Sequence, residues 1–170
     1  MNNLELFDKR WEYIEKVALS SVRRQLEMYS FDLSEVNNDL QRACNEWFSG
    51  KLAPAIWYED FVQNQSQKAK NFKVYAKSIR LNMVEYHKPN SLWAYCVTAV
   101  SLPITYFGIG QITSWELLGK AVCSIGTGVL VWSACQAKIT SQKNKYEELI
   151  VSLYHEQLKE YGEQLRNIIL

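Results

Sequence analysis

The clearest feature of the hydrophobic pattern is a pair of long uncharged runs in the second half of the chain. Residues 89–115 contain no charged side chain, and a second uncharged run covers residues 121–137. An α-helix rises about 1.5 Å per residue, so about 20 apolar residues cross the hydrocarbon core of a bilayer. The pattern predicts two membrane-spanning helices, near 92–112 and 117–137, joined by a turn at 113–116.

Aromatic residues lie near the ends of both predicted spans. Trp93 and Tyr95 open the first span, Trp132 lies near the end of the second, and Trp115 falls at the turn. Trp and Tyr are enriched at the two membrane–water interfaces. Lys120 is one turn inside the second span, from where its long side chain can reach the headgroups. We therefore expect these five residues to lie at the membrane interfaces.

Basic residues flank the predicted hairpin on one side. Residues 61–88 hold six bases and one acid, and three lysines, at 138, 143 and 145, follow the second span. Lys and Arg favour the cytoplasmic side, and basic segments beside a span also contact anionic lipid. The predicted location is the cell inner or plasma membrane, as a multi-pass integral protein with both termini in the cytoplasm.

The first third of the chain has the periodicity of amphipathic helices. Apolar residues recur every three or four positions from Leu4 to about Tyr29 and again over residues 33–48. Asp32 is a suitable N-cap for the second helix, and Gly50 is a natural stop after it. Residues 1–50 are therefore predicted to form an N-terminal helical pair.

A third amphipathic helix is predicted over residues 54–88, because Pro54 suits a first helical turn and no breaker follows before His87. Its apolar residues alternate in steps of three and four, as do the a and d positions of a coiled coil. The predicted seam positions are Val62, Gln65, Ala69, Phe72, Ala76, Ile79 and Met83. Gln65 is polar, and it either sets register or oligomer state or is tolerated in ordinary core packing.

Residues 138–170 are predicted to form a C-terminal amphipathic helix, which leaves the second span beside the helix that leads into the first. Two long amphipathic helices in that position are expected to pair as an antiparallel stalk. The predicted fold class is therefore all-α: a two-span transmembrane helical hairpin (92–137) with long amphipathic cytoplasmic helices and a coiled-coil stalk. The alternative is a soluble helical bundle that buries the hairpin.

Small and hydroxyl-bearing residues within the spans form a candidate site. They are Ser101, Thr105, Ser124, Gly126 and Gly128. Small residues let helices approach closely in lipid, where packing and hydrogen bonds hold helices together. We interpret these residues either as helix-packing positions or as the lining of a wet pore in an oligomer.

Composition narrows the classes of chemistry that the chain can perform. The net charge of +1 exerts no global attraction for nucleic acid, and the four cysteines and two histidines have no metal-ligand spacing. Its G-x-G pairs lie inside apolar runs rather than in a phosphate-binding loop, and no nucleophile signature occurs. We predict no catalytic, cofactor-binding or metal site, no cofactor, and no enzymatic activity.

The first functional hypothesis is a non-enzymatic integral membrane protein that acts by self-assembly or partner binding. In a bacterium this suits an exclusion, immunity or membrane-disrupting pore effector. The expected partners are the lipid bilayer, further copies in a homo-oligomer, and another membrane or cytoplasmic protein, but no nucleic acid. The second hypothesis is a passive membrane-anchored coiled-coil scaffold for a soluble partner.

The layout of amphipathic helices, a tight two-span hairpin and a long tail helix, with the aromatic pair Trp57 and Tyr58 upstream, resembles the two-helix membrane effectors of bacterial defence systems known as SLATT domains. The resemblance concerns topology and implies a membrane effector. It assigns no role to an individual residue of this chain.

Overall fold

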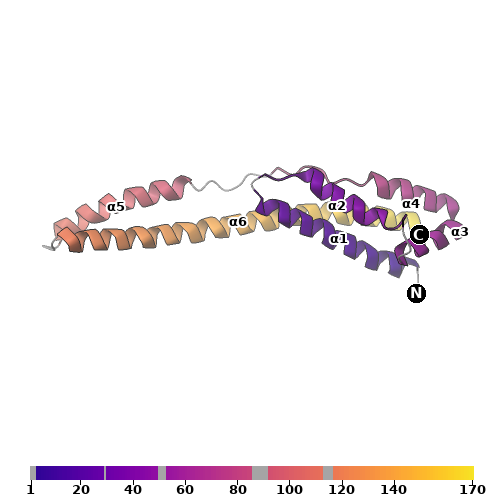
Figure 1. The fold of residues 1–170 in the computed structure, drawn as a ribbon, viewed down its shortest axis with the longest axis horizontal. Coiled ribbons are helices and arrows are strands. Elements are labelled where there is room, and N and C mark those ends of the chain that lie inside the picture. The colour runs from indigo at the N-terminus through magenta and orange to yellow at the C-terminus, as the bar shows by residue number, and fades with distance from the viewer. Residues whose placement is uncertain (1–2, 29, 50–52, 86–91, 113–116) are drawn as a thin grey trace. The chain divides into compact units, whose positions relative to one another are not determined.

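The computed structural model is all-helical in the residues that it describes, which confirms the predicted fold class at that level (Figure 1). It describes residues 3–28, 30–49, 53–85, 92–112 and 117–170, apart from the side chains at 3, 108–112 and 117–120. Six helices and no strand occur there: α1 (Asn3–Glu27), α2 (Leu33–Asn45), α3 (Ala53–Asn64), α4 (Ser66–Ser78), α5 (Leu92–Ile112) and α6 (Leu117–Ile169).

The chain divides into two compact units. The first, here called the aromatic unit, comprises residues 1–85 and 147–170, and the second, called the hairpin unit, comprises residues 86–146. Helix α6 contributes its N-terminal part to the hairpin unit and its C-terminal part to the aromatic unit. The second predicted span and the predicted C-terminal helix are thus parts of one continuous helix.

Helices α1 and α2 match the predicted N-terminal pair. The side chain of Asp32 accepts a hydrogen bond from the Ser34 amide at 2.8 Å, which is the expected N-cap of α2. Charged side chains also join the two helices, since Arg24 Nη2 lies 2.9 Å from Asp39 Oδ2. The apolar stripes of both helices face inward, with Ile14 and Val36 among the fully buried residues.

The prediction of one continuous helix over residues 54–88 is wrong. The backbone leaves helical geometry at Gln65, with φ −145° and ψ 62°, so α3 ends at Asn64 and α4 begins at Ser66. The physical reason is that the break lets α3 fold back onto α4. On a straight helix Phe61 and Phe72 would be about 16 Å apart along the axis, whereas their ring centroids are 6.1 Å apart here.

Residues 79–85 are not helical either, because side chains of neighbouring helices bind their backbone groups. Asn37 accepts from the Leu81 amide at 2.8 Å and donates to the Leu81 carbonyl at 3.2 Å. From α6, Tyr161 donates to the Arg80 carbonyl at 2.8 Å and Gln157 accepts from the Asn82 amide at 2.9 Å. Backbone groups released from a helix thus find partners without water.

The core of the aromatic unit is built around Phe72, which is fully buried. Rings from three other parts of the unit lie within 6.3 Å of it, centroid to centroid: Phe7 of α1, Trp47 and Phe48 after α2, and Trp57, Tyr58 and Phe61 of α3. Several of these pairs are edge-on, which aromatic rings prefer over a face-to-face sandwich. One α4 side chain therefore connects α1, α2 and α3.

The C-terminal part of α6 completes this core. Its buried residues recur every three or four positions and are Ile150, Tyr154, Leu158, Gly162, Leu165 and Ile169. Gly162 lies directly against Trp11 of α1, so that a Cβ atom at this position would come within 2.7 Å of Trp11 Cδ1. Glycine suits this position because the indole ring occupies the space that a side chain would need.

Candidate functional site

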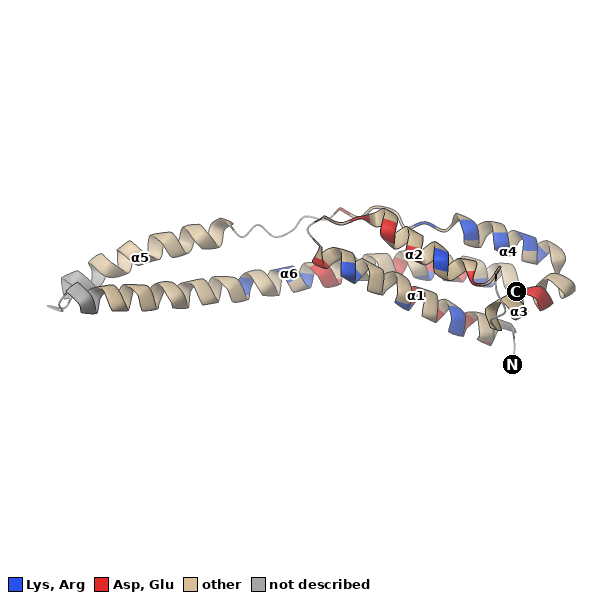
Figure 2. Ribbon diagram, in the orientation of Figure 1, with Lys and Arg blue, Asp and Glu red and all other residues tan. Residues whose placement is uncertain are grey.

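The hairpin unit contains both segments that the sequence predicts to span a membrane. Helix α5 has the bounds of the first predicted span, and no charged residue occurs in α5 or between 121 and 137 of α6 (Figure 2). Exposed large apolar side chains occur along both helices: Leu92, Tyr95, Val97, Val100, Leu102, Ile104 and Phe107 of α5, and Val122, Ile125, Val129 and Leu130 of α6.

One helix in the described part of the chain is long and apolar enough to cross a membrane. It is Ala121–Ile169, whose most apolar window of 18 residues has a mean hydropathy of 1.3. The apolar segment Leu92–Phe107 of α5 is shorter than this criterion requires. Core helices of soluble proteins pass the same test, but they are mostly buried, whereas 17 % of this window is buried. The two-span hairpin stays a prediction.

Small residues let α5 and α6 approach each other within the hairpin unit. A Cβ atom on Gly128 would lie 2.5 Å from Leu102 Cδ2, so the glycine makes room for the leucine. Ser124, one turn earlier, and Ala94 and Cys135 are buried as well. In contrast, a Cβ atom on Gly126 would meet nothing within 4 Å. Gly128 is thus packed against α5, whereas Gly126 borders open space.

The hydroxyl groups of the hairpin bond to carbonyl oxygens of their own helices. Thr98 donates to Ala94, Ser101 to Thr98 and Thr105 to Ser101, all at 2.8–2.9 Å. In α6, the hydroxyls of Thr127 and Ser133 donate to the carbonyls four residues earlier at 2.9 Å. These polar groups need neither water nor a partner helix, and Ser101 and Thr105 are half-buried.

Three of the predicted interface residues gather at one end of the hairpin unit. The rings of Tyr95 and Trp132 are 4.8 Å apart, and Lys138 Nζ lies 5.7 Å from the centroid of the Trp93 ring. Residues distant in sequence meet here because α5 and α6 run antiparallel. Trp115 lies outside the described residues, and the side chain of Lys120 is not described.

The predicted seam residues do not share one helix face in the structure. Four of them are buried in the aromatic unit: Ala69, Phe72 and Ala76 of α4, and Ile79 after it. Val62 and Gln65, at the junction of α3 and α4, are exposed, as is Met83 in the non-helical segment. Gln65 marks the break between the two helices instead of a polar position inside a seam.

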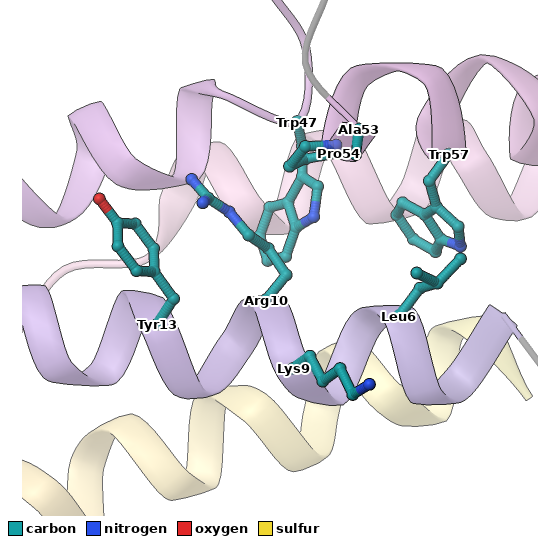
Figure 3. Close-up of a pocket in the computed structure, with 8 residues that line it drawn as sticks. All are labelled: Leu6, Lys9, Arg10, Tyr13, Trp47, Ala53, Pro54 and Trp57. Atoms are coloured by element: carbon teal, nitrogen blue, oxygen red, sulfur yellow. The ribbon is translucent and has the colours of Figure 1, made fainter. Parts of the chain in front are cut away.

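The aromatic unit also contains a pocket that sequence analysis missed (Figure 3). Its volume is about 300 Å³, and its lining comes from α1, the turn after α2 and the start of α3: Leu6, Lys9, Arg10, Tyr13, Trp47, Ala53, Pro54 and Trp57. The aromatic and aliphatic side chains make it mainly apolar. No sequence signal predicted it, since the pocket depends on how three helices meet.

Arg10 is the main polar group beside this pocket. Its guanidinium forms an ion pair with Glu46, donates to the Ala43 carbonyl at 3.2 Å and lies 4.4 Å from the centroid of the Tyr13 ring. Behind it, burial raises the pKa of the Cys44 thiol to about 12 although the positive charge of Arg10 opposes the shift. Cys44 is therefore a packed thiol rather than an activated nucleophile.

No group of three or more His, Cys, Asp or Glu side chains able to hold a metal ion occurs among the described residues. Comparisons with protein-family models, with curated proteins and with solved structures find no match to this chain.

Proposed function

We propose that the chain is a non-enzymatic integral membrane protein that acts by assembly. In this proposal residues 92–112 and 117–137 cross the bilayer as a hairpin, and both termini lie in the cytoplasm. The aromatic unit is then a cytoplasmic domain that binds neighbouring copies or a partner protein. In a bacterium such a protein would serve as an exclusion, immunity or membrane-disrupting effector.

The exposed apolar surface of the hairpin unit carries this proposal. In water, a helix that packs on a soluble domain keeps a polar face toward solvent. Here the exposed side chains described in α5 and in residues 121–137 are apolar, apart from Tyr95 near one end of the hairpin and Ser133, whose hydroxyl bonds within its own helix. Backbone and hydroxyl groups satisfied within the segment are what hydrocarbon requires.

The predicted stalk is retained in the proposal in a shorter form. Tyr75 of α4 meets Tyr161 of α6 with 6.4 Å between ring centroids, and its hydroxyl bonds to Gln164. Further along, Asn82 bonds to Gln157. From Tyr75 to Asn82 the partners in α6 change from Gln164 to Gln157, so the two segments run in opposite directions. This supports an antiparallel pairing of residues 75–82 with the C-terminal part of α6.

Membrane fractionation of the full chain tests the proposed location. We expect the chain to stay in the membrane pellet through washes with high salt and with carbonate at alkaline pH, and to be released by detergent. Release by either wash, as a monomer stable without detergent, would show that the uncharged segments are buried in a soluble bundle and would refute the proposal.

Disulfide cross-linking in membranes tests assembly. Gly126 lies in open space and Gly128 lies against Leu102, so Gly126→Cys in a background without other cysteines should cross-link two copies, while Gly128→Cys should not. Gly126, Ser133 and Val122 are exposed positions on one face of α6. If single cysteines at these three positions all fail to cross-link, assembly through this face is excluded.

A passive membrane anchor is the second candidate function, and the bonding of the hydroxyls favours it. Because Ser101 and Thr105 donate to their own helix, these hydroxyls do not require a wet pore. Dye release from liposomes separates the candidates. Release by the reconstituted chain supports a membrane-disrupting effector, whereas intact liposomes together with a 1:1 complex with a soluble partner support an anchor.

A further inference from the structure

The pocket of the aromatic unit is lined by two side chains whose buried N–H groups lack an acceptor. Trp57 is 5 % exposed, and nothing among the described residues accepts a hydrogen bond from its Nε1. The buried Nε of Arg10 is unpaired in the same part of the chain. Buried polar groups of native proteins are nearly always hydrogen-bonded. Because both donors belong to one lining, a single bound molecule can satisfy them.

The lining itself offers these donors no carboxylate. Trp11, in the same aromatic core, shows the usual arrangement, since its Nε1 donates to Glu15 at 2.9 Å. The pocket, in contrast, is lined by two bases and by no acid. The group that complements it is therefore a hydrogen-bond acceptor rather than a donor.

The two unpaired donors lie toward opposite ends of the pocket. Figure 3 shows Trp57 pointing toward Leu6 at one end, and Arg10 beside Trp47 and Tyr13 toward the other. Leu6 and Tyr13 are two helical turns apart, which is about 10 Å along α1. Aromatic and aliphatic side chains line the space between the two ends. The pocket thus matches an elongated apolar molecule with an acceptor at each end.

Positive charge remains at the Arg10 end. The bonds from Arg10 to Glu46 and to the Ala43 carbonyl use Nη2, so they leave Nε unpaired. Glu46 offsets the charge of Arg10, but Lys9, which is exposed on α1, forms no ion pair with a described side chain. An acceptor that carries a negative charge is therefore favoured at this end.

We propose that the pocket binds a flat two-ring aromatic carboxylate, with its carboxylate at Arg10 and Lys9 and a second oxygen at Trp57 Nε1. Rings of the ligand pack edge-on or offset against the indole and phenol rings of the lining. The volume of about 300 Å³ lies at the small end of the range for ligand sites.

Access to the two N–H groups requires small movements of side chains. Leu6 and Arg10 are only partly buried, and rotamer changes are common on binding. All the lining residues belong to the aromatic unit. Binding at this site therefore does not depend on the proposed membrane location.

Three probes of similar shape test the two ends separately. The compound 6-hydroxy-2-naphthoate carries both acceptors, 2-naphthoate lacks the distant oxygen, and 6-hydroxy-2-naphthamide lacks the charge. Each is titrated into the full chain in phosphatidylcholine nanodiscs, with empty nanodiscs as the blank. Nuclear magnetic resonance of nitrogen-15-labelled indoles locates the site, with the Trp57 signal assigned by its loss in Trp57→Phe. Isothermal titration calorimetry gives the dissociation constants.

We expect 6-hydroxy-2-naphthoate to shift the Trp57 indole signal until the site is saturated. Ala53→Trp adds bulk at an exposed position of the lining and should abolish the shift. Ile56→Trp is the matched control, because Ile56 is exposed on the same helix outside the lining, and this variant should bind normally.

The contribution of each end appears as a loss that is specific to one kind of probe. Replacing Trp57 by β-(3-benzothienyl)alanine keeps the fused rings and removes the N–H. It should weaken binding of 6-hydroxy-2-naphthoate about two- to tenfold and leave 2-naphthoate unchanged. Lys9→Gln should weaken binding of both acids by up to about fivefold and spare the amide. Lys16→Gln, two turns further along α1, should change neither.

Several results would overturn the proposal. Equal affinity for the acid and the amide would refute an anionic ligand. A Trp57 signal that none of the probes shifts, or equal loss of binding in Ala53→Trp and Ile56→Trp, would refute the site. Tighter binding of N-acetyltryptophanamide than of all three probes would assign the pocket to a side chain of a partner protein. A chain that proves soluble is titrated in buffer without nanodiscs, so failure of the membrane location leaves these outcomes readable.

Discussion

Substitution of Gly162 by alanine should destabilise the aromatic unit, although alanine is the better helix former. Gly162 lies inside α6, where Gly→Ala normally gains about 1 kcal/mol. A Cβ atom here would come within 2.8 Å of Trp11 Cε2 and 2.7 Å of Trp11 Cδ1. Such distances are too short for a carbon contact, so the indole ring has to move.

The size of the expected loss in stability follows from the contacts that Trp11 makes. Its ring is stacked 6.3 Å from Phe7 and 6.3 Å from Trp47, and its Nε1 donates to Glu15 at 2.9 Å. Displacing it disturbs three contacts, which places the overpacking penalty near the upper end of the usual range of about 1–3 kcal/mol. After subtracting the helix propensity gain, we expect a net loss of about 1–2 kcal/mol.

Thermal unfolding of the full chain in detergent, followed by circular dichroism and tryptophan fluorescence, measures this loss. We expect a midpoint lower by about 2–8 °C for a chain of this size. Gly126→Ala is the matched control, since it is another Gly→Ala change in α6, at a position with open space. In a Trp11→Leu background the Gly162→Ala change should cost less than it does in the unmodified chain, because the smaller side chain leaves room for the methyl group. A Gly162→Ala variant as stable as the unmodified chain would refute the close contact between α1 and α6.

Other substitutions test the remaining parts of the structure. Phe72→Ala should destabilise the aromatic unit by about 3–5 kcal/mol, as measured by urea unfolding, whereas Val74→Ala, on the exposed side of the same helix, should have little effect. As the only cysteine of the chain, Cys44 should resist maleimide in the folded state and react on unfolding, and labelling at pH 8 as fast in the folded chain as in urea would contradict its burial. Because burial raises the pKa of this thiol to about 12, the folded state should lose stability as the pH rises above the ordinary thiol value near 9.0. Gly128→Leu should lower the melting temperature of the chain in detergent more than Gly126→Leu, since only Gly128 packs on Leu102, and equal effects would argue against that contact.

The helices of this protein could be predicted from sequence wherever one local rule determined the outcome. The N-terminal pair was predicted because periodic apolar residues and the Asp32 cap pointed to the same bounds. The bounds of α5 followed from the uncharged run of the sequence. In these segments no tertiary contact had to compete with the local pattern.

The break at Gln65 and the non-helical segment 79–85 could not be predicted in that way. Both depend on partners far away in the sequence: Phe61 folds onto Phe72, and Asn37 binds the backbone of Leu81. A weak local signal existed in the second case. From Ile79 to Asn82 apolar and polar residues alternate, which is typical of an extended chain, but the longer helical period on either side obscured it.

The candidate site illustrates the same limit at the level of single residues. Sequence placed Ser101, Thr105, Ser124, Gly126 and Gly128 in one set, because all are small and lie in apolar runs. The structure separates them by surroundings: the first two hydroxyls bond to their own helix, Ser124 and Gly128 are buried, and Gly126 meets open space.

This separation implies that packing within the hairpin and association between copies depend on different residues. Bulk at position 128 should disturb the hairpin of a single chain, because the side chain would collide with Leu102 of α5. Bulk at position 126 leaves that contact intact and can only affect a surface that another molecule covers. A Gly126→Leu variant that folds normally but no longer assembles would therefore locate the association surface, whereas one that both folds and assembles normally would move that surface to another face of the hairpin.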